Sequence, residues 1–279
     1  MALSIEPTGA ACGARVTGVD LTRALDAAIV AELRAAWLDH HVLVFPDQAI
    51  DDDDLERFAL AFGPFGHDPF FGPIPGREHI AAIRRDADET SPLFAENFHS
   101  DWSFQARPPQ GTVLRSVVTP TTGGDTLFAN QHAAYAAMPA ALRERMASLR
   151  AIHSAKLPYS KEGTYGDADQ GTRSMDIRPS DEALAEYVHP LVLEHPESGR
   201  PAVFSTLGYI IGLEGMAPEE AMPLLKEIYD WQTREEVIYR HKWAPDMLVL
   251  WDNRSVLHAA TGGYEGHDRL LHRTTIGAA

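Results

Sequence analysis

GTVLRSVVTPTTGGDTLFAN, residues 111–130, consists of two short apolar runs separated by a turn that is rich in threonine and glycine. Short runs of β-branched and apolar residues bounded by Gly, Pro, Asn and Asp are typical of antiparallel strands. The same texture recurs from about residue 80 onward, in PLVLEHPESGRPAVFST, DMLVLWDN and LLHRTTIG. The recurrence predicts a mainly β core of the sandwich or jelly-roll type, with HPESGR as a hairpin turn.

Other segments have helical spacing. Residues 26–40 place apolar side chains on one helix face, and residues 42–46 then predict a buried strand that Pro46 ends. Residues 51–66 begin with four aspartates, which suit a helix N-terminus better than a calcium loop. We also expect helices within residues 130–149 and 217–234. Residues 156–181 are polar and lack periodicity, so a long surface loop that acts as a lid is expected there.

Composition narrows the classes of partner. The 279 residues suit one domain, residues 1–279, and the formal charge of −16 argues against nucleic acid and anionic membrane as partners. The single cysteine, Cys12, excludes an intramolecular disulfide and fits a reducing cytosol. Neither a signal peptide nor a membrane span is recognisable, so the sequence predicts a cytoplasmic protein.

Candidate metal ligands lie in ENFHSDWSFQ, residues 96–105. His99 and Asp101 sit two positions apart, and side chains at that spacing on a strand share one face. WDNRSVLHAA adds His258 at the end of an apolar strand. Two histidines and a carboxylate form the facial triad of non-haem Fe(II) oxygenases, although the same ligands also suit Zn²⁺. On these residues alone, hydrogen-bonded core histidines or a hydrolytic zinc enzyme remain alternatives.

Two arginines follow the last histidine. Arg269 and Arg273 lie in RLLHRTTIG, and on a strand they would share a face with Leu271 between them. A buried arginine needs an anionic partner, and its planar fork binds carboxylate or sulfonate through two hydrogen bonds. One could therefore hold an acidic co-substrate and the other an acidic substrate; surface arginines that pair with the abundant acids are the alternative.

The motif series FHSDWSF, GGDTLFANQHAAYAAMP, WDNRSVLHAA and RLLHRTTIG resembles the taurine dioxygenase and 2,4-dichlorophenoxyacetate dioxygenase family. The likeness extends from GARVTGVDL, near the start, to the end of the chain. It implies a double-stranded β-helix (a cupin-like jelly roll) flanked by helices. It also implies an Fe(II)- and 2-oxoglutarate-dependent dioxygenase that uses O₂ and releases succinate and CO₂.

The resemblance assigns roles to residues. His99, Asp101 and His258 would ligate Fe(II), and Thr126 with Arg269 would bind the far carboxylate of 2-oxoglutarate. Arg273 matches a position that binds the acidic group of the prime substrate. The remaining substrate-contact candidates are His67, Phe70 and Asn97. Relatives are often dimers or tetramers, so a homo-oligomer is expected.

The sequence departs from the taurine enzymes at the substrate site. Phe70 stands where they offer a tyrosine, and Ala95 stands where they offer an asparagine, with Asn97 nearby. These changes favour an anionic substrate with a larger apolar body than taurine, such as an alkyl sulfonate, an alkyl sulfate or an aryloxy-alkanoate. The alternatives are a hydroxylase or desaturase of a biosynthetic pathway and a non-catalytic metal-binding jelly roll.

Overall fold

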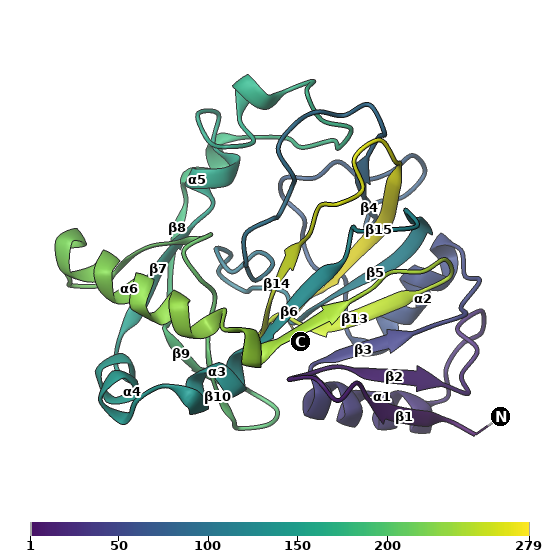
Figure 1. Cartoon of the computed structure of the whole chain (residues 1–279), viewed down its shortest axis with the longest axis horizontal. Coiled ribbons are helices and arrows are strands. Elements are labelled where there is room, and N and C mark those ends of the chain that lie inside the picture. Colours follow the sequence, from purple (N-terminus) through teal and green to yellow (C-terminus); the bar gives the residue numbers. More distant parts are fainter. Residues whose placement is uncertain (1, 279) are drawn as a thin grey trace.

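The computed structural model describes residues 2–278. The largest of its sheets has seven strands, and Figure 1 shows how the other elements lie around it. Every neighbouring pair in this sheet is antiparallel except β2 and β3. The strand order is β1 (Ser4–Pro7), β2 (Ala14–Thr17), β3 (Val42–Phe45), β13 (Leu248–Asp252), β5 (Gly111–Val118), β15 (Arg269–Ile276) and β4 (Ala81–Arg85).

A smaller antiparallel sheet packs against one face of the large one. Its strands are β12 (Ile238–His241), β6 (Thr126–Asn130) and β14 (Val256–Ala260). Between the two sheets lies an apolar cluster that includes Val44, Leu114, Phe128, Val249 and Val256. This arrangement confirms the predicted mainly β jelly-roll fold with flanking helices.

Helices cover the opposite face of the large sheet. α1 (Ala27–His40) and α2 (Asp52–Phe62) pack there over a second apolar cluster that includes Trp37, Phe45 and Phe58. Because successive strand residues alternate between faces, β3 is buried on both sides and reads as a continuous apolar run. Asp51 caps α2 through a reciprocal capping box with Asp54, which confirms that the aspartates mark a helix start.

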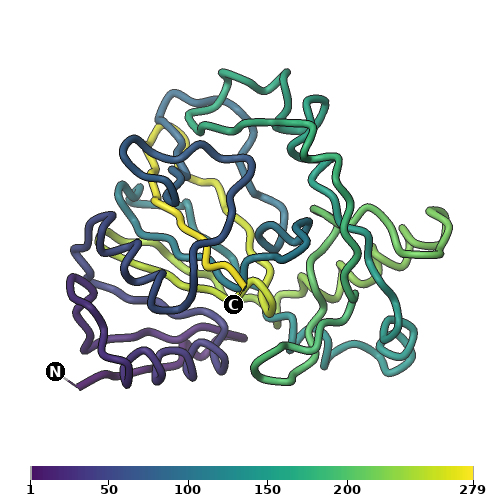
Figure 2. Tube along the Cα trace, turned by 180° about the vertical axis from the view of Figure 1, so that it is seen from behind, coloured from purple at the N-terminus to yellow at the C-terminus, as the bar shows by residue number. Residues whose placement is uncertain are grey.

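A third apolar cluster joins three helices to two small sheets, β11–β7–β8 and β10–β9. Figure 2 shows the backbone of this part of the chain in teal and green. The helices are α3 (Gln131–Ala137), α4 (Ala140–Met146) and α6 (Pro218–Gln232). The strands are β7 (Arg150–Ser154), β8 (Glu186–Pro190), β9 (Val192–Glu194), β10 (Pro201–Val203) and β11 (Ile210–Leu213). The β9–β10 pair confirms the hairpin that HPESGR predicted.

Two segments differ from expectation. The helix expected within residues 130–149 is split into α3 and α4, because Met138 precedes Pro139 and adopts an extended conformation. Residues 156–181 contain α5 (Lys156–Tyr159) and the 3₁₀ turn Asp167–Asp169, with further 3₁₀ turns at Asp181–Leu184 and Glu235–Val237. Within residues 2–278, no helix combines the length and the hydropathy that crossing a bilayer requires.

Candidate metal centre and its cavity

A two-residue bridge brings the predicted ligands together. The amide of His99 donates to the carbonyl of His258 at 3.0 Å, and the amide of His258 donates back to His99 at 2.8 Å. His258 belongs to β14, whereas His99 lies outside any strand and Asp101 lies in the turn that follows. The strand expected through His99 and Asp101 was therefore wrong: the two side chains share a site because the chain turns there.

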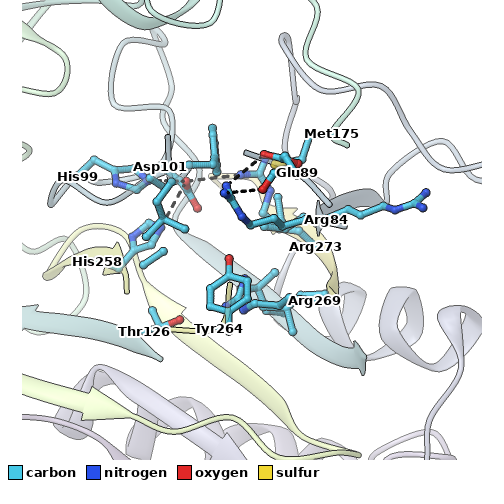
Figure 3. Close-up of a pocket in the computed structure, with 18 of the residues that line it drawn as sticks. Arg84, Glu89, His99, Asp101, Thr126, Met175, His258, Tyr264, Arg269 and Arg273 are labelled. Carbon is cyan, nitrogen blue, oxygen red and sulfur yellow. Dashed lines mark hydrogen bonds and ion pairs between the residues drawn. The ribbon is translucent and has the colours of Figure 1, made fainter. Parts of the chain in front are cut away.

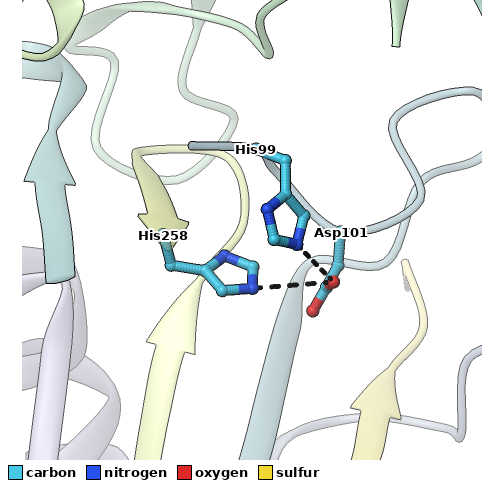
Figure 4. A group of neighbouring side chains, drawn as sticks. All are labelled: His99, Asp101 and His258. Carbon is cyan, nitrogen blue, oxygen red and sulfur yellow. Dashed lines mark ion pairs between the residues drawn. The ribbon is translucent and has the colours of Figure 1, made fainter. Parts of the chain in front are cut away.

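The three side chains converge on one point (Figure 4). The Nε2 atoms of His99 and His258 lie 3.8 and 3.7 Å from Oδ1 of Asp101. One ligand atom from each residue lies within 4.8 Å of the other two. Two imidazoles and one carboxylate at such separations can bind a single divalent ion and leave the rest of its coordination sphere open.

Hydrogen bonds orient the ligands. Nδ1 of His99 lies 2.9 Å from the carbonyl of Asn97, which directs Nε2 toward the site. The hydroxyl of Thr112 donates to Oδ2 of Asp101 at 2.6 Å, which leaves Oδ1 for a metal. Asn253 donates to Thr112 at 2.9 Å and accepts from the indole of Trp251 at 2.9 Å. The WDN part of the sequence motif therefore supports Asp101 through Thr112.

Protonation favours cation binding. Burial lowers the pKa of His258 to about 3, helped by the neighbouring His99. Burial also lowers the pKa of His99, although Asp101 opposes it. Burial alone would raise the pKa of Asp101, but His258, Arg273 and His99 outweigh it and lower that pKa. Neutral imidazoles beside an ionised carboxylate are the protonation states that a divalent metal needs.

The trio opens into a cavity that lies between β15 of the large sheet and β6 and β14 of the small one (Figure 3). Arg269, Leu271 and Arg273 all line it, which confirms that the two arginines of β15 share a face. Its apolar lining consists of Ile83, Leu93, Phe94, Ala95, Leu114, Met175, Trp251, Ala260 and Leu271.

Arg269 is a buried cation. Among residues 2–278 it forms no ion pair with a carboxylate, and its Nε has no hydrogen-bond partner. Burial lowers the pKa of its guanidinium, and the ring of Tyr264 lies 5.8 Å from its Cζ. Thr126 lines the same cavity and accepts a hydrogen bond from the indole of Trp243 at 3.0 Å. This end of the cavity is therefore built to receive an anion.

The GGDT sequence makes this end possible. Gly123 and Gly124 both have positive φ, which favours glycine. A Cβ on Gly123 would lie 2.3 Å from the carbonyl oxygen of Gly263, and one on Gly124 would lie 3.2 Å from the side chain of Arg269. The glycines thus let the loop approach Arg269 and set Thr126 beside it.

Arg273 has a different environment. Its Nη2 donates to Asp68, its Nη1 lies 3.7 Å from Asp101, and its Cζ lies 4.7 and 4.9 Å from the rings of Phe71 and Trp102. Burial opposes its positive charge, but Asp68 and Asp101 raise the pKa of Arg273. Unlike Arg269, this guanidinium already has an internal counter-ion.

Two loops that line the cavity are joined by hydrogen bonds. Arg85 donates to Glu89 at 3.2 Å, and Glu89 accepts from the amide and the hydroxyl of Ser174 at 2.9 and 2.7 Å. Arg173 donates to the carbonyl of Pro92 at 2.7 Å. These bonds tie the segment after β4 to the segment that was expected to act as a lid.

Three predicted substrate contacts lie outside this cavity. His67 is exposed and faces other hollows, and Phe70 is buried in an aromatic cluster, stacked on Tyr159 at 4.8 Å. Asn97 is exposed and lines a neighbouring hollow beside His99. The path of residues 66–72 explains these positions. This segment is hydrogen-bonded to β15 at Gly66 and Thr275, and from there Asp68, not His67, reaches Arg273. Substrate contact by these three residues stays a prediction.

Sequence reasoning missed Asp68, Glu89, Tyr264 and Trp243. Asp68 is adjacent to His67 in FGHDPF, but no spacing indicated which of the two would face the site. Tyr264 and Trp243 lie in connecting segments, where the sequence has no periodicity from which the direction of a side chain can be predicted.

Comparison with known proteins agrees with this geometry. Residues 4–275 match the model of the taurine catabolism dioxygenase TauD, TfdA family. An (S)-phenoxypropionate/alpha-ketoglutarate-dioxygenase of Sphingobium herbicidovorans is 35% identical over 99% of this chain and 95% of its own. An alpha-ketoglutarate-dependent sulfate ester dioxygenase of Pseudomonas putida is 32% identical over 98% of this chain and 89% of its own. The crystal structure of a taurine dioxygenase from Burkholderia xenovorans superposes on this chain with a TM-score of 0.82. The two sequences are 29% identical, and the superposition covers 100% of this chain and 92% of the other.

Proposed function

Because the chain belongs to the taurine catabolism dioxygenase TauD, TfdA family, we propose that it hydroxylates a small organic acid with an apolar body. The chain is a 2-oxoglutarate-dependent dioxygenase. The observation that carries the site assignment is one cavity that holds both the His–Asp–His trio and a buried arginine that forms no ion pair with a carboxylate of residues 2–278.

The donor set fits Fe(II), which we propose as the resident metal. His99, Asp101 and His258 would hold it, and two nitrogens with one oxygen are the ligands of the facial triad. Bound iron would supply the redox chemistry by which 2-oxoglutarate is decarboxylated and the substrate C–H bond is oxidised. The chain contributes fixed ligand directions, through Asn97 and Thr112.

We propose that Arg269 and Thr126 bind the carboxylate of 2-oxoglutarate that lies far from the metal. Arg269 provides charge and a planar fork of donors. An indole N–H can only donate, so Trp243 takes a lone pair of Thr126 and leaves the threonine hydroxyl proton free for the carboxylate. The apolar lining would exclude water and strengthen both contacts.

The substrate class rests on relatives and on charge. The relatives' names include phenoxypropionate and sulfate ester as substrates, and both are anions with an apolar body. Arg273 is the second buried cation that faces the cavity beside the trio, so we assign it to the acidic group of the substrate. Apolar side chains such as Phe94 and Met175 would hold the body.

A substrate panel tests this function. Enzyme supplied with Fe(II), 2-oxoglutarate and O₂ would be offered phenoxypropionates, alkyl sulfates, alkanesulfonates and taurine, with succinate as the readout. We expect substrate-dependent succinate formation with the larger acids and little with taurine. Fast and selective turnover of taurine, or no stimulation by any acid, would contradict the proposed substrate class.

Location, domain organisation and assembly rest on the sequence and the resemblance. We propose a cytoplasmic protein, since one cysteine allows no intramolecular disulfide. We also propose that residues 1–279 form one domain and assemble as a dimer or tetramer. Light scattering on the eluting protein would settle the mass, and a monomer would contradict the expected assembly.

A further inference from the structure

We propose that Asp68 is an exchangeable internal counter-ion of Arg273, which occupies the guanidinium edge in the free enzyme and withdraws when an acidic substrate binds. Asp68 would then set the enzyme's selectivity between acids and neutral molecules of the same shape. The inference rests on the proposed function, because it takes Arg273 as the site for the acidic group of the substrate.

The first observation is that the Asp68–Arg273 contact is half of a fork. Asp68 accepts from Nη2 of Arg273, yet Oδ1 of Asp68 and Nε of Arg273 are both buried without a hydrogen-bond partner in residues 2–278. Nε and Nη2 form one edge of a guanidinium, and an ideally placed carboxylate would bind both. A substrate acid could therefore make two bonds where Asp68 makes one.

The second observation is crowding of negative charge. Nη1 of Arg273 lies 3.7 Å from Oδ1 of Asp101, and the rings of Phe71 and Trp102 flank the guanidinium. A third carboxylate beside Asp68 and Asp101 would add repulsion in a site of low dielectric. An acid can thus use Arg273 well only when Asp68 leaves.

The third observation is that Asp68 has space to withdraw. Asp68 lines a second hollow that is partly open to solvent, together with His67, Glu78, His79 and Thr275, and none of the three metal ligands lines it. Its side chain is already 24% exposed, against 6% for Arg273. Burial raises the pKa of the Asp68 carboxyl, and the positive charge of Arg273 only partly offsets this effect. The carboxylate therefore gains solvation when it moves outward.

The backbone on both sides of Asp68 is held by β15 and by residue 178, whereas its carboxylate is held by Arg273 and the amide of Phe71. The amide of Gly66 donates to the carbonyl of Thr275 at 2.9 Å, and the amide of Arg178 donates to the carbonyl of Phe70 at 2.9 Å. A Cβ on Gly66 would lie 2.4 Å from Oγ1 of Thr275, so the segment lies directly on β15. A rotation of the Asp68 side chain, without loop movement, would release the edge of Arg273.

The test compares acids with their neutral counterparts. Wild type, Asp68→Asn and Asp68→Ser would be loaded with Fe(II) and 2-oxoglutarate without O₂. Calorimetry would then measure binding of 2-phenoxypropionate and its amide, and of hexanesulfonate and its sulfonamide. Asp52→Asn is the matched control, because Asp52 pairs with Arg115 and His272 on the opposite face of β15.

We expect both Asp68 variants to bind the acids about tenfold tighter or more, which corresponds to the coupling measured for close charge pairs. Affinity for the neutral counterparts should change less than about threefold. The gain should vanish when Arg273→Gln is added, and Asp52→Asn should resemble wild type. Thermal melts would confirm that the variants are folded, and Asp68→Ser serves as the second variant if Asp68→Asn is unstable.

Unchanged or weaker acid binding in folded Asp68 variants would overturn the counter-ion proposal and leave the dioxygenase assignment standing. Equal binding of acids by wild type and Arg273→Gln would instead overturn the assignment of the acid to Arg273. A larger rise in turnover of the acids than of their neutral counterparts in Asp68→Asn, relative to wild type, would support the exchange independently of calorimetry.

Discussion

The hydroxyl of Thr112 donates a 2.6 Å hydrogen bond to Oδ2 of Asp101, while Oδ1 of Asp101 faces both imidazoles of the trio. Thr112 lies on β5 and Asp101 lies in a turn, so the bond fixes a loop ligand on a strand. The direction in which Asp101 presents its free oxygen therefore depends on the large sheet.

Thr112→Val should weaken metal binding by about 10–100-fold, since partners of metal ligands commonly contribute that much. Valine keeps the shape of threonine and removes the donor to Asp101. Anaerobic calorimetry with Fe(II) would measure the affinity. Thr274→Val is the control, because Thr274 is buried and its hydroxyl has no partner in residues 2–278; equal effects of the two changes would argue against an orienting role.

Arg269→Met should have opposite effects on ligand binding and on the stability of the ligand-free protein. Loss of the cation should raise the Kd for 2-oxoglutarate about 100-fold or more. Removal of a buried charge without a carboxylate partner should raise the Tm of the free protein by about 2–4 °C. Calorimetry and thermal melts would measure both.

The matched change is Arg150→Met on β7, where the side chain is exposed and pairs with Glu214. It should alter neither the affinity for 2-oxoglutarate nor the Tm appreciably. A loss of less than about threefold in 2-oxoglutarate affinity for Arg269→Met would contradict the assigned role.

Trp243→Phe should raise the Kd for 2-oxoglutarate about fivefold, the loss expected for one hydrogen bond. Without the indole donor, the hydroxyl of Thr126 has no fixed direction. In a Thr126→Val background the same change should have no further effect, which separates positioning from a general packing defect. Trp231→Phe on α6 is the control, and a similar loss there would count against the role of Trp243.

Acid should destabilise the fold through buried neutral histidines. Burial lowers the pKa of His153 to about 3, with a smaller contribution from His189. Between about pH 6.5 and pH 3 the unfolded chain binds a proton at this ring and the folded protein does not, so the free energy of unfolding falls as pH falls. At pH 5 the His153 ring should lower the free energy of unfolding by about 2 kcal/mol relative to pH 7.5.

Urea unfolding of His153→Gln at both pH values would measure this contribution. The difference between pH 7.5 and pH 5 should shrink by about 2 kcal/mol relative to wild type. The same substitution at the exposed His267 serves as the control. An undiminished difference for His153→Gln would show that this histidine is not the source of the acid sensitivity.

Much of the fold was predictable because it depends on local pattern. β5, β13 and β15 carry short runs of apolar and β-branched residues, and Asp51 marks the start of α2. The two-residue alternation along β15 is also sufficient to predict that Arg269 and Arg273 share one face. These features follow from strand and helix periodicity, which the sequence contains directly.

The rest depends on contacts between distant segments. The residues near His99 in the sequence do not indicate that an isolated bridge to His258 directs its side chain toward Asp101. A strand through residues 99–101 was the simpler expectation. The choice of Asp68 over His67 as the neighbour of Arg273 depends on how residues 66–72 lie against β15. Such packing is set by tertiary structure, and single-residue patterns do not encode it.

The most direct test of the iron site is anaerobic addition of Fe(II) and 2-oxoglutarate, followed by the visible absorption of a ferrous 2-oxo acid complex. Wild type should develop the band at one equivalent of iron, whereas Asp101→Ala and His258→Ala should not, although both should remain folded by circular dichroism. A band of full intensity in either variant, or none in wild type, would contradict the assignment of His99, Asp101 and His258 as the iron ligands.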